Sequence, residues 1–343
     1  MSKILDAEAF LAKAETLPVI DVRTPAEFEQ GHIPGAINLP IFTNEERAQV
    51  GTKYKRASKE SAVILGLEIV GPKLATFVKR AKKIAPGRKL LIHCWRGGMR
   101  SGSMAWLFST AGFEAEILEG GYKAYRRYIR NRFADKANLV VLGGMTGSGK
   151  TEVLHELTRM NEQVLDLEGV AHHKGSAFGA LGQEKQPTTE QYENDLYEIW
   201  KRFDLSKTIW IEDESHAVGS VWINEALFDQ MRQSPVIKME VPKEERIKRL
   251  VREYANFDVE VLKGIVKKIE RRLGGQHVKH AFECLDRGDF ATVADITLYY
   301  YDKAYGYGLT QRGDQPIYNL ELEKDDPEEN AKRVMAFSKT FEL

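Results

Sequence analysis

The sequence of 343 residues has few cysteines, no net charge and no long apolar run. Lysine and arginine together number 50, as do aspartate and glutamate, so bulk charge predicts no general attraction to nucleic acid. No run approaches about 18 apolar residues, and the N-terminal segment lacks the apolar core of a signal peptide. We therefore expect no membrane span and a cytoplasmic protein. The two cysteines, Cys94 and Cys284, lie far apart in the sequence and are expected to stay reduced.

Two domains are expected at this length, because single hydrophobic cores tend to stop growing near about 250–300 residues. The first part of the chain alternates short apolar runs with helical segments, and a second such pattern begins at Asn138. We predict an α/β protein with a parallel-sheet domain over residues 1–134 and a second α/β domain over residues 135–343, the C-terminal part of which is helical. We expect Cys284 to be a core residue and the acidic stretch after residue 320 to be a solvated surface.

The first candidate site is a loop that opens at Cys94, directly after an apolar run over residues 89–93. Two glycines let its backbone curl so that N–H groups point inward, and a helix is expected to follow, which together make an anion site. Arg96 and Arg100 add positive charge. These features favour the thiolate, so we expect Cys94 to be a nucleophile with a pKa below the ordinary value of about 8.5. The alternative is a buried, inert cysteine.

The second candidate site is a phosphate-binding loop over residues 144–151, which fits the pattern G-x-x-x-x-G-K-[ST] between a predicted strand and a predicted helix. Lys150 supplies a point charge, and Thr151 can hold Mg²⁺. Asp213, in an acidic turn after the apolar run 209–211, is the preferred second Mg²⁺ ligand or water-organising carboxylate, and Glu212 is the next candidate. A purely structural acidic turn is the alternative. The predicted phosphate-binding residues are Gly144, Thr146, Gly147, Ser148, Gly149, Lys150 and Thr151.

Other polar segments are less informative. His172 and His173 have no Cys or carboxylate cluster at ligand spacing, so we expect their loop, with the following Lys174, Gly175 and Ser176, to lie at the mouth of the phosphate site. Several arginines in the helical part are interpreted as lid residues, RNA-phosphate contacts or solvated helix faces. They are Arg246, Arg249, Arg252, Arg271 and Arg272.

A basic helix is predicted over residues 122–133. Its cations recur at i, i+3, i+4 and i+7 and therefore share one face, beside a stripe of apolar and aromatic residues. The alternatives for this face are contact with nucleic-acid phosphates and plain solvation. The cations are Lys123, Arg126, Arg127 and Arg130, and the stripe is Tyr122, Tyr125, Ile129 and Phe133.

Residues 20–40, the loop that begins at Cys94 and the turn at 118–121 resemble a rhodanese domain. The resemblance implies that Cys94 carries sulfur or selenium as a persulfide-like anion, and that Asp21 and Arg23 are structural. A rhodanese-like domain followed by a P-loop domain, together with the segments 166–169 and 175–179, makes the whole chain resemble bacterial tRNA 2-selenouridine synthases.

This family resemblance implies a two-step reaction at the wobble 2-thiouridine of tRNA. Geranyl diphosphate first alkylates the 2-thio group, and a selenium nucleophile supplied from selenophosphate then displaces geranyl thiol. The P-loop would hold the diphosphate with Mg²⁺ at Thr151 and Asp213, and Cys94 would be the S-selanylcysteine intermediate, with Arg96 and Arg100 beside it. No tightly bound cofactor is expected, the basic helix is the candidate tRNA contact, and the protein is expected to be a monomer or weak dimer.

Three other functions stay open at this point. An ATP-dependent tRNA sulfurtransferase would use the P-loop to activate an acceptor and would show substrate-stimulated ATP turnover. A P-loop small-molecule kinase with a rhodanese-like sensor domain would phosphorylate a metabolite without tRNA. A non-catalytic tRNA-binding module would keep its function without Lys150 or Cys94.

Overall fold

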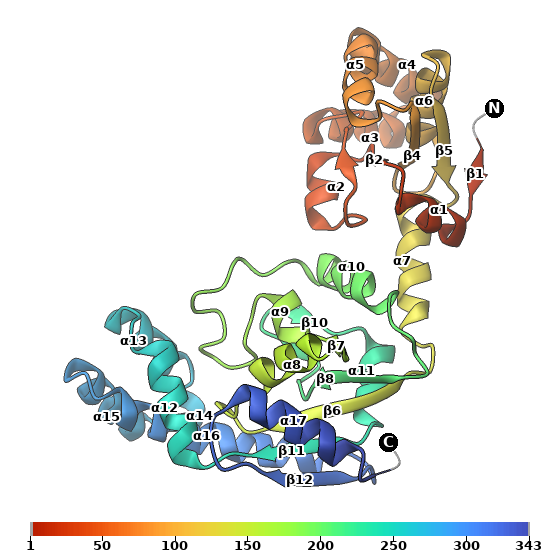
Figure 1. Cartoon of the computed structure of the whole chain (residues 1–343). Coiled ribbons are helices and arrows are strands. Elements are labelled where there is room, and N and C mark those ends of the chain that lie inside the picture. The colour runs from red at the N-terminus through yellow and green to blue at the C-terminus, as the bar shows by residue number, and fades with distance from the viewer. Residues whose placement is uncertain (1–2, 342–343) are drawn as a thin grey trace. The chain divides into compact units, whose positions relative to one another are not determined.

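The computed structural model describes residues 3–341, which form two compact units (Figure 1). The first unit ends at Arg132 and the second begins at Phe133, whereas the sequence predicted the boundary after residue 134. Each unit has a parallel sheet of its own, as expected for an α/β protein.

The N-terminal unit is built on a five-stranded sheet in the order β1-β5-β4-β2-β3. Every neighbouring pair of its strands is parallel, and Asp21 at the end of β2 lies opposite His93 at the end of β4. Because the strands run the same way, the loops that follow β2 and β4 meet at one edge of the sheet. The strands are β1 (Ile4–Leu5), β2 (Val19–Asp21), β3 (Ile37–Asn38), β4 (Lys89–His93) and β5 (Glu114–Leu118).

Helices cover both faces of this sheet. Helix α2 begins with Pro25 in its first turn and a reciprocal capping box between Thr24 and Glu27, which are signals that the sequence itself contains. Helices α1 and α7 pack on each other and on β5, while α5 and α6 pack together on the other side of the sheet. The helices are α1 (Ala7–Ala14), α2 (Pro25–Gln30), α3 (Asn44–Arg56), α4 (Lys59–Val70), the 3-10 turn η1 (Gly71–Lys73), α5 (Leu74–Ile84), α6 (Met99–Thr110) and α7 (Gly121–Arg132).

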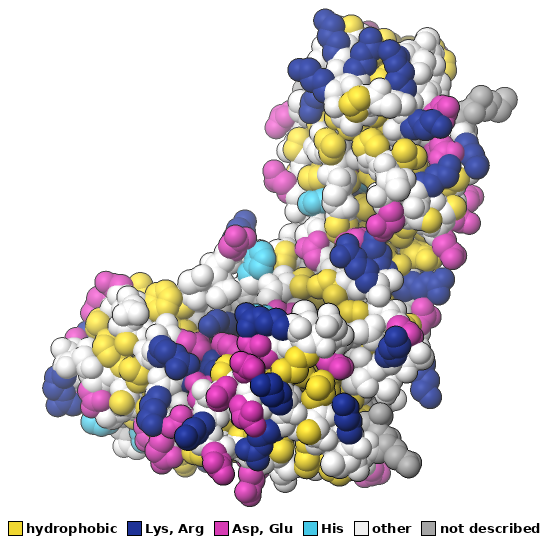
Figure 2. Space-filling model, in the orientation of Figure 1, with side chains coloured by type: hydrophobic (Ala, Val, Ile, Leu, Met, Phe, Trp, Pro, Cys, Tyr) yellow, Lys and Arg dark blue, Asp and Glu magenta, His cyan; other side chains and the backbone are white. Residues whose placement is uncertain are grey.

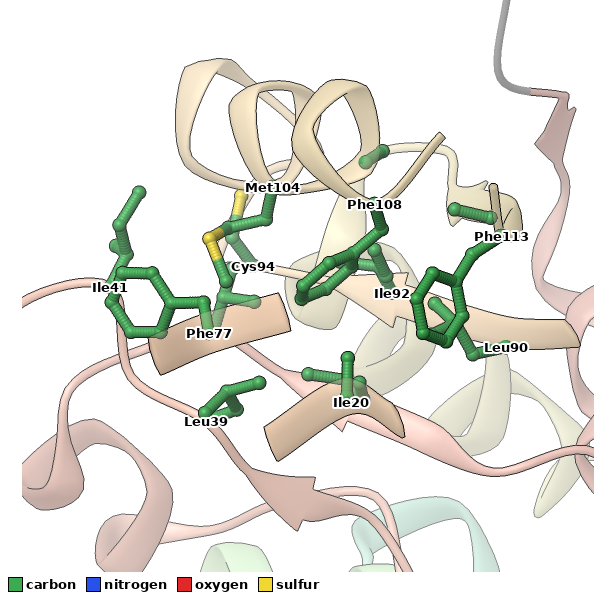
Figure 3. Close-up of a cluster of buried hydrophobic side chains, with 14 of the residues drawn as sticks. Ile20, Leu39, Ile41, Phe77, Leu90, Ile92, Cys94, Met104, Phe108 and Phe113 are labelled. Carbon is green, nitrogen blue, oxygen red and sulfur yellow. The ribbon is translucent and has the colours of Figure 1, made fainter. Parts of the chain in front are cut away.

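The core of the N-terminal unit includes the predicted nucleophile. Ile92 of β4 packs in one cluster with Phe77 of α5 and Phe108 of α6. Figure 3 shows Cys94 in this cluster beside Met104. Cys94 is only 3% exposed, so the groups around its sulfur, rather than bulk water, set its chemistry.

One stretch of the N-terminal unit departs from the expectation that nothing in the sequence could span a membrane. Residues Lys59–Ile84 are long and apolar enough by length and composition, although a single such helix is weak evidence for a membrane span. The structure divides the stretch into α4, η1 and α5, with Pro72 in the short turn between the two helices. Only 17% of its apolar window is buried, which leaves part of α4 available to line a pocket.

The C-terminal unit contains a second five-stranded parallel sheet, in the order β12-β11-β6-β8-β7. Strand β6 is central, and the phosphate-binding loop leaves its carboxyl end. The strands are β6 (Asn138–Gly144), β7 (Gln163–Leu165), β8 (Thr208–Glu212), β11 (Val236–Glu240) and β12 (Ile317–Glu321), and a small antiparallel pair is formed by β9 (Ala217–Val218) and β10 (Val221–Trp222).

Helices of the C-terminal unit fall into two groups. One group covers the sheet: α8 and α17 pack together over one core, and α9, α10 and α11 contact strands of the same sheet. The other group consists of α12 to α16. Within it, α13 to α16 pack around a separate core that contains Cys284, as predicted for that residue. The helices are α8 (Lys150–Arg159), α9 (Leu167–Ala171), α10 (Thr189–Trp200), α11 (Glu225–Arg232), α12 (Lys243–Tyr254), α13 (Val259–Lys268), α14 (Glu270–Leu273), α15 (Gly275–Asp286), α16 (Phe290–Thr310) and α17 (Pro327–Ser338).

The acidic C-terminal stretch is a solvated surface at most of its carboxylates, as the sequence predicted. The exposed acidic residues are Glu321, Glu323, Asp326, Glu328 and Glu329. Asp325 is the exception, because it pairs with the buried side chain of Arg249 and, at 2.9 Å, with Arg252. The stretch begins at the end of the edge strand β12, and Leu320 and Leu322 are buried in the core beneath α17, which the sequence did not indicate.

Candidate active sites

The backbone of Cys94 rests on the first turn of α7. The N–H of Tyr122 donates to the carbonyl oxygen of Cys94 at 2.8 Å, and the N–H of Lys123 donates to the carbonyl oxygen of Trp95 at 3.0 Å. Gly121 has φ +60°, and a Cβ there would collide with the carbonyl oxygen of Cys94 and with two backbone nitrogens of the loop. Only glycine therefore allows α7 to begin this close to the loop.

The sulfur of Cys94 faces the N-terminal turn of α6. Its Sγ lies 3.2 Å from the Oγ of Ser101. Burial alone would raise the pKa of Cys94, but hydrogen bonds from the Ser101 hydroxyl and from the backbone N–H groups of Arg96 and Ser101, with the positive charge of Arg100, together hold it below the ordinary thiol value. The loop thus favours the thiolate, in the direction that the sequence predicted.

The two predicted arginines of this site differ in their surroundings. Arg100 donates from Nη1 and Nη2 to the two carboxylate oxygens of Glu27, at 2.6 and 3.2 Å. Burial raises the pKa of Glu27, but the hydrogen bond and charge of Arg100 outweigh it and lower that pKa. Because Glu27 also closes the capping box of α2, that helix positions Arg100. Arg96 is exposed and reaches the sulfur through its backbone N–H.

Asp21 and Arg23 form a buried ion pair behind the loop, consistent with the structural role expected for them. Arg23 donates from Nε and Nη2 to Asp21 Oδ2 at 2.9 and 2.6 Å, and its Nη2 also donates to the carbonyl of Gly31 at 2.7 Å. Its guanidinium lies 3.8 Å from the centre of the Tyr122 ring. The pair therefore joins the end of β2 to the helix that supports Cys94.

An apolar pocket of ≈ 920 Å³ opens beside Cys94. Its walls are α2, α3, α4 and the Cys94 loop, and its polar end contains Glu27, Arg96 and Arg100. Nothing in the sequences of α3 and α4 indicates that they enclose a space, so the pocket was not found from the sequence. The apolar side chains that line it include Phe42, Tyr54, Val63, Leu67, Val70 and Met99.

The phosphate-binding loop has the predicted setting between β6 and α8. Lys150 folds back over the loop and donates to the carbonyl oxygen of Gly144 at 3.0 Å. Gly147 has φ +80°, and a Cβ there would lie 3.2 Å from the carbonyl oxygen of Arg246, so helix α12 packs directly on the loop. The predicted residues all line one pocket of ≈ 300 Å³: Gly144, Thr146, Gly147, Ser148, Gly149, Lys150, Thr151 and Asp213.

Two glutamates that the sequence did not single out lie at the floor of this pocket. Thr151 donates its hydroxyl to Glu168 at 2.8 Å, and Glu168 lies beside Glu214. Burial raises the pKa of Glu214 well above the ordinary value, and the negative charge of Glu168 raises it further, against the opposing effect of Lys150. The pair is therefore a place where two carboxylates compete for one proton or one cation.

The carboxylate of Asp213 is held by protein side chains. Its carboxylate pairs with Arg312, which is buried, and accepts a hydrogen bond from the hydroxyl of Tyr305 at 3.0 Å. Tyr305 also accepts the N–H of Gly144 at 2.8 Å. The carboxylate in contact with Thr151 is that of Glu168, so the assignment of Asp213 to Mg²⁺ stays a prediction, and Asp213 acts here as a support of the loop.

The pocket also joins segments that are far apart in the sequence. Lys174 and Ser176 line it, as expected for a loop at the mouth of the phosphate site, and so do Arg232 and Arg249. Arg249 pairs with Glu152 at 2.7 Å and is 3% exposed, so it is neither a solvated cation nor part of a loose lid. Among residues 3–341, no three His, Cys, Asp or Glu side chains are grouped so as to hold a metal ion.

A small apolar pocket adjoins the phosphate pocket. It has a volume of ≈ 40 Å³, is lined mostly by apolar side chains and shares several lining residues with the phosphate pocket. The shared residues are Thr146, Ser176, Leu250, Tyr254 and Tyr301.

The predicted basic helix is α7. Its stripe of apolar and aromatic residues is buried, as expected, and Lys123, Arg127 and Arg130 are exposed, while Arg126 is half-buried. The helix therefore presents three cations to solvent along the face that the sequence predicted.

Comparisons with known proteins cover both units. The family described as the tRNA 2-selenouridine synthase AAA domain matches residues 137–328, more than half of the chain, and the rhodanese-like domain family matches residues 6–128. A protein of Nitrosomonas europaea named tRNA 2-selenouridine synthase is 31% identical, over 88% of this chain and 91% of its own length. Proteins of the same name from Bordetella petrii and a Sulfurovum strain are 34% and 33% identical, with 88% and 94% of this chain covered and 89% and 95% of their own lengths. The chain belongs to the tRNA 2-selenouridine synthase family.

Proposed function

We propose that this protein is a transferase that converts the wobble 2-thiouridine of tRNA to 2-selenouridine in two steps. In the first step the 2-thio sulfur attacks the first carbon of geranyl diphosphate, and diphosphate leaves. In the second step a selenium nucleophile, supplied from selenophosphate, adds at C2 of the base and geranyl thiol leaves. The observation that carries the proposal is the pairing, in one chain, of a thiolate-stabilising loop at Cys94 with a phosphate pocket that adjoins a small apolar pocket.

The phosphate pocket fits the first step. The first backbone N–H groups of α8 and the charge of Lys150 suit a diphosphate leaving group, and the adjoining apolar pocket suits a prenyl chain better than a nucleoside. This apolar pocket is small, so a ten-carbon chain has to displace side chains to enter it fully. The oxygens of Thr151, Glu168 and Glu214 are hard donors that fit Mg²⁺, and phosphate oxygens of the ligand would complete its coordination. The Mg²⁺ would neutralise the negative charge of the leaving diphosphate.

The Cys94 loop fits the second step. The hydrogen bonds that stabilise a thiolate here also stabilise an anionic selenium atom attached to the sulfur. After this selenium has bonded to C2, a free thiol has to attack the Cys94 sulfur to release 2-selenouridine. This step leaves a mixed disulfide between Cys94 and the thiol. Water takes the phosphoryl group of selenophosphate as phosphate, and the selenide that is released attacks the Cys94 sulfur of this disulfide, so that the thiol leaves and selenium is again attached to Cys94. The first turnover needs the same mixed disulfide, formed from Cys94 and a small-molecule disulfide. Burial of the sulfur protects the selenium anion from solvent and oxidants.

Nucleoside mass spectrometry tests both steps in one experiment. The full-length protein is incubated with 2-thiouridine-containing tRNA, geranyl diphosphate, selenophosphate and a thiol together with its disulfide, and we expect an S-geranyl nucleoside that gives way to 2-selenouridine. Lys150→Ala should abolish geranylation, and Cys94→Ala should abolish selenation while geranylation continues. Cys284→Ala is the matched control, because Cys284 is a core residue of the helical part.

Two outcomes would contradict the proposal. Retained geranyl transfer in the Lys150→Ala protein would remove the phosphate loop from the first step. An unchanged nucleoside with ATP consumed instead would favour the sulfurtransferase or the kinase.

A further inference from the structure

The apolar walls of the pocket beside Cys94, formed by α3 and α4, have no part in holding the sulfur or its anion. We propose that this pocket binds the geranyl chain of S-geranyl-2-thiouridine while selenium replaces sulfur, so that each unit of the protein has its own apolar site for the same chain. This inference rests on the proposed function. It adds that the second step is specific for a prenylated tRNA, because the N-terminal unit recognises the leaving group.

The chemistry of the second step fixes where the chain must lie. A C2–Se bond forms and the C2–S bond breaks, and the bonding electron pair leaves on sulfur as geranyl thiolate, which takes a proton from solvent. The selenium is attached to Cys94, so C2 and the sulfur of the leaving group lie within a few bond lengths of that residue. The first carbons of the chain therefore start at the polar end of the pocket, where Arg96 and Arg100 can stabilise the departing thiolate.

The walls of the pocket match a branched hydrocarbon chain. Phe42 and Val70 are buried at the wall, and Val63 and Leu67 project from α4. With ≈ 920 Å³ the pocket is far larger than the small apolar pocket at the phosphate loop, and it falls in the usual range for a small-molecule site. It can hold a complete geranyl chain next to the reacting base.

Exposure of apolar side chains points to the same occupant. Tyr54, Leu67 and Met99 line the pocket and are 59%, 67% and 61% exposed. Figure 2 shows hydrophobic side chains open to solvent on the N-terminal unit, in the upper part of the view. A bound hydrocarbon chain would remove such surface from water, which is a favourable change. Leu67 and Met99 offer a charged or sugar-like ligand no charge and no strong hydrogen-bonding group.

Two residues of α4 allow a sharp test. Gly66 lines the pocket, and a Cβ there would meet only the ring of Phe42, at 3.5 Å, so Gly66→Phe should fill the pocket without disturbing the helix backbone. Leu67→Ser removes an exposed apolar wall residue. Ile64→Ser is the control, because Ile64 is 52% exposed on the same helix and does not line the pocket.

The experiment measures kcat/KM for conversion of S-geranyl-2-thiouridine tRNA and of S-methyl-2-thiouridine tRNA to 2-selenouridine by the full-length protein. We expect wild type and Ile64→Ser to prefer the geranyl substrate by about tenfold or more, and Gly66→Phe and Leu67→Ser to lose most of that preference. The rate of Cys94 alkylation by iodoacetamide should be the same in all four proteins, which shows that the loop is intact.

Failure of this inference can be distinguished from failure of the proposed function. If wild type converts the geranyl substrate and both pocket variants convert it equally fast, the pocket does not bind the chain, although the two-step reaction stands. Equal rates of the wild-type protein on the S-geranyl and S-methyl substrates would also overturn the inference. A wild-type protein that converts neither substrate would contradict the proposed function itself.

Discussion

Tyr122 donates its backbone N–H to the carbonyl oxygen of Cys94 at 2.8 Å, so the helix after the sheet supports the residue that carries the nucleophile. The contact requires Gly121, the residue before Tyr122, to pack backbone against backbone. We expect Gly121→Ala to destabilise the N-terminal unit by about 1–3 kcal/mol and to slow Cys94 alkylation, because φ is positive and the new Cβ has no space. Urea unfolding and alkylation rates measure both effects. Gly71→Ala, with open space around the residue, is the control; equal behaviour of the two variants would contradict this account.

Ser101 is expected to control the acidity of Cys94. Burial raises the pKa of Cys94, and hydrogen bonds from Ser101 are prominent among the effects that lower it below the ordinary value. Ser101→Ala should therefore raise that pKa, which would appear as an upward shift of the midpoint in the pH dependence of alkylation. The lowered pKa stabilises the folded protein at pH values above the ordinary thiol pKa, and this stabilisation is lost as pH falls through the pKa of the folded state. Ser101→Ala should therefore also lower the free energy of unfolding at high pH. An unshifted midpoint would remove Ser101 from this role, and Ser103→Ala is the matched control.

The pKa of Glu214 predicts a stability change with the opposite sign. Burial and the charge of Glu168 raise this pKa. The protonated side chain therefore makes its full contribution to stability below the ordinary glutamate pKa, and this contribution is lost as pH rises through the pKa of the folded state. Glu214→Gln should therefore gain stability relative to wild type as pH rises from about 4 towards about 8. Urea midpoints across that range check the prediction. If the urea midpoints of the two proteins change with pH in parallel, the pKa of Glu214 does not affect stability.

Asp213 and Arg312 are expected to matter for stability even without ligand. Arg312 is buried, so Asp213→Asn leaves its charge without its carboxylate and should cost about 3–5 kcal/mol. Glu328→Gln, which removes one partner of an exposed pair with Lys332, should change stability by less than about 1 kcal/mol. Denaturant unfolding compares the two. A small effect of Asp213→Asn would restore the alternative in which Asp213 is free to bind Mg²⁺.

The exposed cations of α7 are expected to contact tRNA. Reversing Lys123, Arg127 and Arg130 to glutamate should weaken tRNA binding and flatten its salt dependence, by about 0.7–0.9 in log–log slope for each phosphate that the variant no longer neutralises. The same reversal at Lys79, Lys82 and Lys83 of α5, which are exposed, controls for net charge. Affinity measured from about 50 to about 200 mM salt tests the prediction. An unchanged slope would leave the face as a solvated helix surface.

Much of the fold could be predicted because its signals are local. The capping residues Thr24 and Glu27 predict the start of α2, and the P-loop spacing predicts the strand–loop–helix order around Lys150. Strand β12 and the helices of residues 44–84 were missed. These elements depend on packing against segments distant in the sequence, and β12 also has a strongly acidic neighbourhood.

The sites could be predicted at the residues that a motif names, and not at their partners. Cys94, Lys150 and Thr151 were found from spacing. Glu168 was not selected because its contact with Thr151 joins residues that are 17 positions apart. The pocket beside Cys94 needs three helices to come together, and no one of them shows it in its sequence. Long-range geometry therefore determines the ligand chemistry that the motifs leave open.

The place where the first unit ends also determines how the chain can be divided. Helix α7 follows the last strand of the sheet and could be taken for a connector, yet the N–H groups of Tyr122 and Lys123 in its first turn support the Cys94 loop. Its side chains Tyr122, Tyr125 and Ile129 are also buried. A fragment that stops at the end of β5 would keep the complete sheet but lose the first turn of α7, whose N–H groups support the Cys94 loop. A fragment meant to keep the Cys94 loop supported should therefore run through Arg132, where the first unit ends.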